Sequence, residues 1–267
     1  MSSRVEQQLQ AISRRFRPLL QDGTRPLEFI GRVAAELPAL FRNGMRQRDL
    51  RYYLDLCGVQ ALPIVVLICL LMGMVMAVNG QIQFSKLGQE IFVADAVGLI
   101  VLKELGPLMV AMVMTGWAGS AFAAEVGTMK LDEQISALET MGIRPESFLV
   151  FPKLAAMLIS MPILTIFGDA AGILGGMIIG VTSMKIPPVA YWTRTLEALD
   201  ITTFVLGAAK SIPFALLITF AGCYCGFNAA NNSQGVGRGA TKAVVCSIFL
   251  IVVADVFITV LYSFIGY

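Results

Sequence analysis

The side chains most able to do chemistry are charged residues inside long apolar stretches of the sequence. Lys103 and Glu104 are adjacent, Lys210 lies in a later stretch, and Asp169 and Asp255 each interrupt another. A charge inside a membrane-spanning segment is costly, so it pairs with an opposite charge or faces a wet cavity. We interpret Asp169 and Asp255 as ion-pairing residues that fix helix register. For Lys103, Glu104 and Lys210 two interpretations stay open: internal salt bridges, or a polar vestibule that accepts a charged group.

Several classes of chemistry are excluded by residues and motifs that the sequence lacks. The chain has no histidine, which rules out haem ligation by histidine, histidine acid–base catalysis and the usual zinc sites. It has no G-x-x-x-x-G-K-[ST] motif, so it binds no ATP through a P-loop. We therefore expect no catalytic residue, metal site or cofactor in this chain. The cysteines are interpreted as small apolar residues: Cys57, Cys69, Cys223, Cys225 and Cys246.

The elements that must position these charges are membrane-spanning helices. Hydrophobic residues make up 57% of the chain and charged residues only 14%, whereas about a quarter of a soluble domain is charged. Five stretches are long enough to cross a hydrocarbon core of about 30 Å: 56–85, 105–124, 154–184, 211–237 and 243–267. None of them alternates polar and apolar residues, which disfavours a β-barrel. The sequence predicts an all-α integral membrane protein with five transmembrane helices over 56–267.

Basic residues predict how the spans are oriented. Fifteen Lys and Arg, ten of them arginines before the first span, fall on one side of the predicted topology, and four fall on the other. The side richer in basic residues faces the cytoplasm. We therefore expect a cytoplasmic N-terminus and a periplasmic C-terminus.

Residues 1–55 are predicted to form helices on the membrane surface. The segments 5–19 and 27–40 each carry a narrow apolar stripe at helical spacing, and Asp22-Gly23 supplies a turn between them. No apolar core follows the basic start, so the segment is not a signal peptide. Arginines on the other faces suit an anionic inner leaflet. The alternative is an ordinary soluble two-helix cap.

Small residues and a proline predict how the spans pack and bend. Two stripes repeat at a spacing of four: Gly168, Gly172, Gly176 and Gly180 on the third span, and Thr115, Gly119, Ala123 and Gly127 on the second. Small residues let helices approach closely in lipid, so we expect a tight core between the second and third spans. The Gly106-Pro107 pair is expected to kink the second span beside its charges.

A short amphipathic helix is predicted between the second and third spans, at about 129–142. Gly142 lies at its C-cap position and Pro145 stops it. About four turns cannot cross a bilayer. The helix is expected to lie at the cytoplasmic surface and offer a mixed apolar and acidic face to a soluble partner; the alternative is a loop that only ties two spans together. The docking surface is assigned seven residues: Lys130, Leu131, Asp132, Glu133, Gln134, Leu138 and Glu139.

Motifs along the chain resemble one known family. They include Lys103-Glu104-Leu105-Gly106-Pro107, Gly119-Ser120-Ala121, Ala124-Glu125-Val126-Gly127-Thr128-Met129, Glu133-Gln134-Ile135, Met141-Gly142 and Gly235-Val236-Gly237-Arg238. Together they are similar to the MlaE/YrbE permease family, and the resemblance runs from about Leu50 to the end of the chain. Trp117 is a departure, because family members usually carry arginine there.

The resemblance implies a function and a set of partners. Members of the family form the membrane subunit of ABC transporters that move phospholipids between bacterial inner and outer membranes and maintain outer-membrane lipid asymmetry. The chain would be an inner-membrane homodimer with an MlaF-like ATPase, which uses ATP and Mg, under each copy. An MlaD-like ring of MCE domains would lie on the other face, often with an MlaB-like STAS protein beside the ATPase, and no nucleic acid is implied. The helix at 129–142 would be the coupling helix.

The resemblance also implies where the lipid binds, namely an outward-facing cavity at the dimer centre lined by the first two spans. We assign five residues to it: Lys103, Glu104, Val75, Val78 and Lys210. Consecutive residues of an α-helix point about 100° apart. We therefore expect Lys103 to meet the lipid phosphate and Glu104 to serve the helix kink or the neighbouring protomer.

Two other classes of protein stay open. A self-contained secondary transporter would need internal inverted repeats, of which five dissimilar spans give no sign. A purely structural membrane subunit would not need the acidic helix at 129–142.

Overall fold

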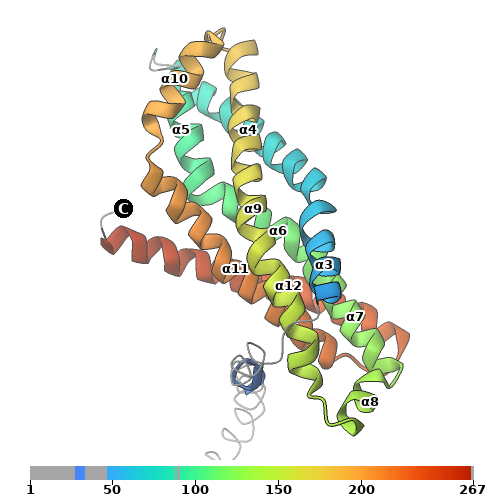
Figure 1. Cartoon of the computed structure of the whole chain (residues 1–267). Helices are drawn as coiled ribbons and strands as arrows, with labels where there is room; N and C mark the ends of the chain where they lie inside the picture. Colours follow the sequence, from blue (N-terminus) through green and yellow to red (C-terminus); the bar gives the residue numbers. More distant parts are fainter. Residues whose placement is uncertain (1–27, 34–46, 87, 89–90, 266–267) are drawn as a thin grey trace, which may run out of the picture.

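The computed structural model describes residues 28–33, 47–86, 88 and 91–265, and these residues are almost entirely helical (Figure 1). Five helical runs in the described part of the chain are long and apolar enough to cross a membrane: 47–85, 92–131, 145–182, 201–227 and 233–264. The predicted all-α fold with five spans is confirmed. Two short helices, α8 (Gln134–Thr140) and α10 (Pro188–Ala198), lie at opposite ends of the molecule (Figure 1).

The first span contains α3 (Gln47–Leu54), the π-helical turn η1 (Asp55–Val59) and α4 (Leu62–Ser85). The predicted boundary at residue 55 therefore falls inside a continuous helical run. Upstream, residues 28–33 are helical, with Phe29 and Val33 buried, and the Phe29 ring packs against Tyr224 and Phe227. The other residues of the two predicted surface helices lie outside the described residues.

The second span contains α5 (Phe92–Ile100), η2 (Val101–Leu105), α6 (Gly106–Met114), η3 (Thr115–Gly119) and α7 (Ser120–Leu131). In η2 the Gly106 N–H bonds the Val101 carbonyl, five residues back, which is π-helical geometry. Pro107 follows at the start of α6 and has no N–H to donate. The helix is therefore irregular directly before Gly106-Pro107, the pair at which a kink is predicted.

The acidic segment after the second span is divided in two, which corrects the single helix predicted at 129–142. The helix α7 continues to Leu131, and α8 begins only at Gln134. Between them Glu133 has φ 57°, a left-handed conformation that ends a right-handed helix. At the other end Gly142 has φ 74°, as a glycine C-cap requires.

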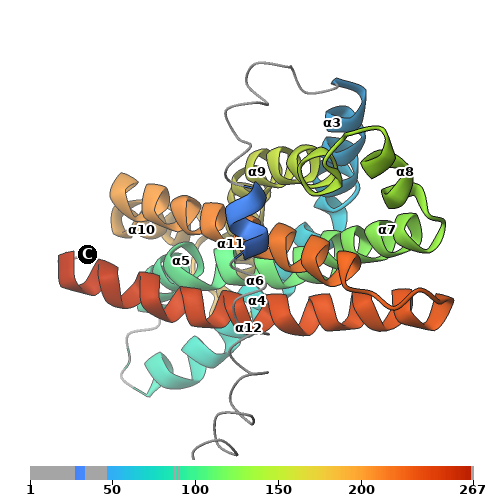
Figure 2. The same ribbon diagram turned by 90° about the horizontal axis from the view of Figure 1, so that it is seen from below.

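The last three spans are α9 (Pro145–Thr182), α11 (Ile201–Phe227) and α12 (Ser233–Ile265), and α12 lies along α11 (Figure 2). The glycine stripe of α9 packs closely on α4. A Cβ on Gly73 of α4 would overlap the Gly172 carbonyl oxygen, and one on Gly175 would overlap the Leu70 carbonyl oxygen. The main chains of spans one and three are thus in direct contact.

The small-residue stripe of the second span contacts the fourth span. A Cβ on Gly222 of α11 would lie 2.8 Å from the Gly119 carbonyl oxygen, and one on Gly226 would lie 2.8 Å from that of Ala123.

The stripe of the third span does face the second span, as expected: a Cβ on Gly172 would lie 2.9 Å from Val101 Cγ1, and one on Gly176 would lie 2.7 Å from Val97 Cγ1. What the prediction missed is that the third span also packs on the first, and that the stripe of the second span packs on the fourth. Stripes of this kind show that a helix packs closely, but they do not identify the helix on the other side.

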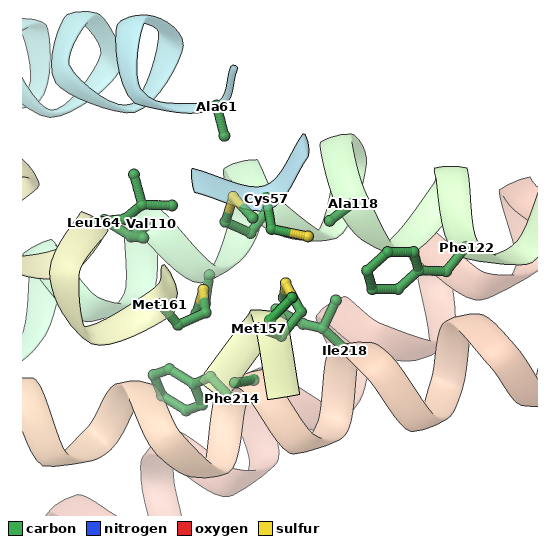
Figure 3. Packing of buried hydrophobic residues seen from close by; sticks show 14 of the residues in the cluster. Cys57, Ala61, Val110, Ala118, Phe122, Met157, Met161, Leu164, Phe214 and Ile218 are labelled. Carbon is green, nitrogen blue, oxygen red and sulfur yellow. The ribbon is translucent and has the colours of Figure 1, made fainter. Parts of the chain in front are cut away.

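The largest buried cluster lies where the first four spans meet, and Ile251 of the fifth span also belongs to it. Met157 and Met161 of α9 point between Phe214 of α11 and Cys57 of η1, with Phe122 of α7 beside them (Figure 3). Flexible thioether side chains suit such an irregular gap. Of the five cysteines, all free, four are buried, in keeping with the interpretation of small apolar residues.

Candidate functional site

Three spans meet at the buried side chain of Lys210. Lys210 on α11 is 2% exposed, and its Nζ donates a hydrogen bond to Glu104 Oε2 of η2 at 2.7 Å. The same Nζ donates to Asp255 Oδ1 at 3.2 Å and to Thr259 Oγ1 at 2.9 Å, both on α12. An ammonium group has three donors, and all three are satisfied. One buried cation therefore joins spans two, four and five.

Gly207 allows η2 to approach α11 closely enough for this contact. Gly207 lies one turn before Lys210, and a Cβ there would overlap the carbonyl oxygen of Leu102 in η2. With only a hydrogen at that position, the main chain of η2 rests directly on α11. Glu104, two residues after Leu102, then reaches the Lys210 ammonium.

A cavity of about 150 Å³ opens beside this charged cluster. Its lining residues come from η2, α11 and α12: Lys103, Glu104, Thr203, Leu206, Gly207, Thr259, Tyr262 and Ser263. Pockets that enclose a drug-sized ligand measure about 300–1,000 Å³. The volume here suits a small polar group and not a molecule with long chains.

Lys103 is the cation of this group that a ligand can reach. Its side chain is exposed, lines the cavity and forms no ion pair with any residue that the structure describes. The two carboxylates of Glu104 and Asp255 outnumber the one buried ammonium of Lys210, and Lys103 brings the formal charge of the four side chains to zero.

The structure brings together three of the five residues assigned to the lipid site. Lys103 and Glu104 line the same cavity, so the expectation that they face apart is wrong. A π-helical turn holds more residues than an α-helical turn, which reduces the angle between neighbours. Glu104 pairs with Lys210 of its own chain. Val75 and Val78 lie on α4 with exposed fractions of 52% and 43%, and they do not line this cavity.

Sequence reasoning recognised one partner of the cluster and missed others. Asp255 forms an internal ion pair, as predicted. Asp169 does not: it is 2% exposed, and neither carboxylate oxygen has a hydrogen-bond partner among the described residues. Thr259 and Tyr262 were missed. Thr259 lies one helical turn after Asp255, and this spacing of four in an apolar span was the available signal.

The segment around α8 forms a second candidate surface, at the end of the molecule opposite α10 (Figure 1). Leu131, Ile135 and Leu138 are half-buried, and no residue of α8 is fully buried. The polar residues assigned to docking are exposed: Asp132, Glu133, Gln134 and Glu139. The predicted mixed apolar and acidic face is present.

Lys130 differs from the other residues assigned to this surface. Its Nζ donates hydrogen bonds to the carbonyl oxygens of Phe227 and Ala229, each at 2.8 Å. These carbonyls lie at the C-terminal end of α11, where a cation is favoured. Lys130 therefore anchors the end of α7 to α11, and it also lines the groove beside α8.

A groove of about 480 Å³ runs beside α8. Glu139 and Ile135 line it from α8, and Glu28, Phe29 and Arg32 line it from the upstream helical segment. Arg32 Nη1 lies 3.2 Å from Glu146 Oε1 at the edge of the groove. Its remaining acidic groups suit a partner with basic and apolar side chains.

Comparison with known proteins places the chain in a recognised group. Residues 51–261 match the family described as Permease MlaE. A probable ABC transporter permease protein of Rickettsia typhi is 35% identical over 202 residues, which cover 76% of this chain and 78% of that protein. The intermembrane phospholipid transport system permease protein MlaE of Haemophilus influenzae is 33% identical over 203 residues, again 76% and 78%. A probable ABC transporter permease protein of Synechocystis is 28% identical over 220 residues, 82% and 84%.

Proposed function

The chain belongs to the MlaE permease family, and on that premise we propose that it moves phospholipids between the inner and outer membranes of a bacterium. It is a multi-pass ABC transporter permease and not an enzyme. We place it in the inner membrane, where its activity maintains the lipid asymmetry of the outer membrane. The name of the Haemophilus relative supports phospholipid as the substrate class.

The observation that carries this proposal is the unpaired Lys103 at a small polar cavity within the membrane. A cation is retained at such depth where it meets water or an anion, and a lipid phosphate is the anion that a membrane supplies. The cavity volume fits a headgroup. The acyl chains then lie along apolar surfaces outside it.

We propose that a second copy of the chain completes the lipid path. Val75 and Val78 belong to an exposed apolar face of α4, together with Leu71 and Ile82. In a homodimer this face lines the space between two copies, where acyl chains find an apolar wall. Lipid contact at Val75 and Val78 is therefore assigned to the dimer.

We propose that the energy for transport comes from an ATPase subunit docked at α8. An ABC permease works with an ATPase, and the exposed acidic face of α8 and the groove beside it offer the surface for it. ATP and Mg bind to that partner, which is MlaF-like, with an MlaB-like STAS protein beside it. An MlaD-like MCE ring lies at the α10 end of the molecule.

Reconstitution with purified partners tests the function. The chain, its ATPase and its MCE partner are placed in donor vesicles, and ATP-driven transfer of labelled phospholipid to acceptor vesicles is measured. Transfer is expected to require ATP and to fall in Lys103→Ala but not in the loop variant Lys86→Ala. A photo-crosslinker at position 103 or 104 should capture labelled phospholipid more strongly than one at Ile248.

Two outcomes would contradict the proposal. Equal capture at every position, or normal transfer by Lys103→Ala, would remove Lys103 from the lipid path. Transport by the chain alone, without a copurifying ATPase, would favour a self-contained secondary carrier.

A further inference from the structure

Asp169 is a buried carboxyl group that the proposed transport path does not use. It lies in the middle of α9, is 2% exposed and has no hydrogen-bond donor to either oxygen among the described residues. No Lys or Arg in the described part of the chain forms an ion pair with it. An ionised carboxylate without a cation or a donor is very unfavourable in a low-dielectric interior.

The carboxyl group lies against the π-helical turn that carries Lys103 and Glu104. A Cβ built on Gly106 would overlap Asp169 Oδ1, so the carboxyl occupies the space that a side chain at position 106 would take. The same point lies 2.9 Å from the Val101 carbonyl oxygen. That carbonyl accepts the Gly106 N–H, which closes η2, and a carbonyl oxygen has two lone pairs that can accept hydrogen bonds.

Among the described residues, no charged side chain on a neighbouring element forms an ion pair with Asp169. On η2, Glu104 is bonded to Lys210 of α11, and Lys103 lines the cavity beside α12. On α4 the nearest titratable group is the buried thiol of Cys69. Asp169 Oδ1 and the Val101 carbonyl oxygen both lie within 2.9 Å of the point where a Cβ on Gly106 would stand. A proton on the carboxyl group supplies the donor for a hydrogen bond between these two acceptors.

We propose that Asp169 is held as a neutral carboxylic acid that donates a hydrogen bond to the main chain of η2. Asp169 is then a positioning residue: it fixes the π-helical turn and so the placement of Lys103 and Glu104 at the cavity. Its effect on lipid binding rests on the proposed function, whereas its protonation and its contact with η2 do not.

Infrared spectroscopy of the purified chain at pH 7 tests the protonation. The carbonyl stretch of a protonated carboxyl group is separate from the bands of ionised carboxylates and shifts in D₂O. The wild-type minus Asp169→Asn spectrum is expected to contain this band, whereas the wild-type minus Asp255→Asn spectrum is not, because Asp255 is paired with Lys210. A difference spectrum for Asp169→Asn that shows only an ionised carboxylate would overturn the proposal.

A matched pair of glycine variants on the same span tests the contact with η2. An added Cβ at Gly106 overlaps Asp169 Oδ1, whereas one at Gly116 meets nothing within 4 Å. Gly106→Ala is expected to shift or remove the protonated band, and Gly116→Ala to leave it unchanged. An unchanged band in a folded Gly106→Ala protein would show that Asp169 does not contact this turn.

Binding of a fluorescent phospholipid in detergent tests the positioning role. Asp169→Asn keeps a neutral donor of the same size and is expected to bind within about twofold of wild type, whereas Asp169→Leu weakens binding about tenfold, the scale of one lost buried hydrogen bond. Equal binding by the Asn and Leu variants would overturn the positioning role. Another outcome is that the infrared spectra show the protonated carboxyl group while the wild-type protein binds no phospholipid. That result would contradict the proposed lipid function, but the contact between protonated Asp169 and η2 would remain supported.

Discussion

The Nζ atom of Lys153 lies 3.3 Å from Glu125 Oε1, and this ion pair joins α9 to α7 shortly before α7 leads to α8. The Lys153 side chain is fully buried, and its Nζ also donates to the Tyr53 hydroxyl of α3 at 2.9 Å. The Tyr53 hydroxyl in turn donates to Glu125 Oε1 at 2.6 Å. The two charged groups and the hydroxyl therefore hold α3, α7 and α9 together at the end of the molecule that carries α8.

Removing Lys153 is expected to destabilise the protein. Lys153→Met leaves Glu125 facing an apolar site without its cation, and the free energy of unfolding should fall by about 2 kcal/mol, less than for a fully buried pair because Glu125 is 29% exposed. Denaturant unfolding in detergent measures the change. The surface pair provides the control: Arg32→Met, which breaks the contact with Glu146, should cost less than about 1 kcal/mol. If the two variants lost the same free energy of unfolding, burial of Lys153 would add nothing to the stabilisation by its ion pair.

Removing Lys210 is expected to destabilise the protein more than removing Lys153. Lys210→Met leaves two carboxylates, Glu104 and Asp255, without their shared cation, and the free energy of unfolding should fall by about 3 kcal/mol, less than for fully buried pairs because the Glu104 side chain is 36% exposed. The triple variant Lys210→Met, Glu104→Gln, Asp255→Asn should regain most of this stability, because no unpaired charge remains. Thermal unfolding in detergent compares them. A triple variant no more stable than the single one would show that the cluster stabilises through shape and not through charge.

The acidic face of α8 is expected to control docking and not folding. Glu133 and Glu139 are exposed, so Glu133→Lys with Glu139→Lys should leave the thermal midpoint unchanged and weaken copurification of the ATPase. Lys130→Ala should behave differently, because loss of its two bonds to the end of α11 lowers stability by about 1 kcal/mol. If the charge-reversed variant copurifies as much ATPase as wild type, the acidic face of α8 is not part of the docking interface.

Tyr191 of α10 gives a pH-dependent prediction. It is fully buried against Gly176 and Gly180, and burial raises the pKa of its phenol from 10.0 to about 12. Between these values the unfolded chain ionises while the folded chain does not, so the contribution of Tyr191 is complete below pH 10 and is lost as pH rises toward 12. Tyr191→Phe should flatten this part of the stability curve. At pH 7 it should be neutral or slightly stabilising, because the buried hydroxyl has no partner among the described residues.

Chemical labelling checks the predicted orientation. Because α8 and α10 follow consecutive spans, they lie on opposite sides of the membrane, and the basic residues predict a cytoplasmic α8. A cysteine placed at Gln134 should be protected from an impermeant reagent in intact cells, and one at the exposed Glu197 should react. The reverse pattern would invert the topology.

The spans and the face of α8 could be predicted because hydropathy and helical spacing are local properties of a sequence. The cluster around Lys210 could not, because Glu104 is 106 residues away from it and Asp255 is 45. Such a pairing depends on which spans are neighbours, and the small-residue stripes did not identify those neighbours. The π-helical turn η2 was missed for a related reason: the Gly106-Pro107 pair signals an irregular helix without stating its form.

The contact of Gly73 with Gly172 and of Gly175 with Leu70 has a consequence for how this chain can evolve. At Gly73 and Gly175 any side chain would occupy the space of a main-chain carbonyl on the opposing helix. Substitution there forces α4 and α9 apart, because the overlapping atoms belong to the main chain and not to a flexible side chain. Drift is open to the outward face of α9, as at Ile163 and Leu174, which are about half exposed. Descendants of this gene are thus free to alter what α9 shows to the membrane while the contact between α4 and α9 stays fixed.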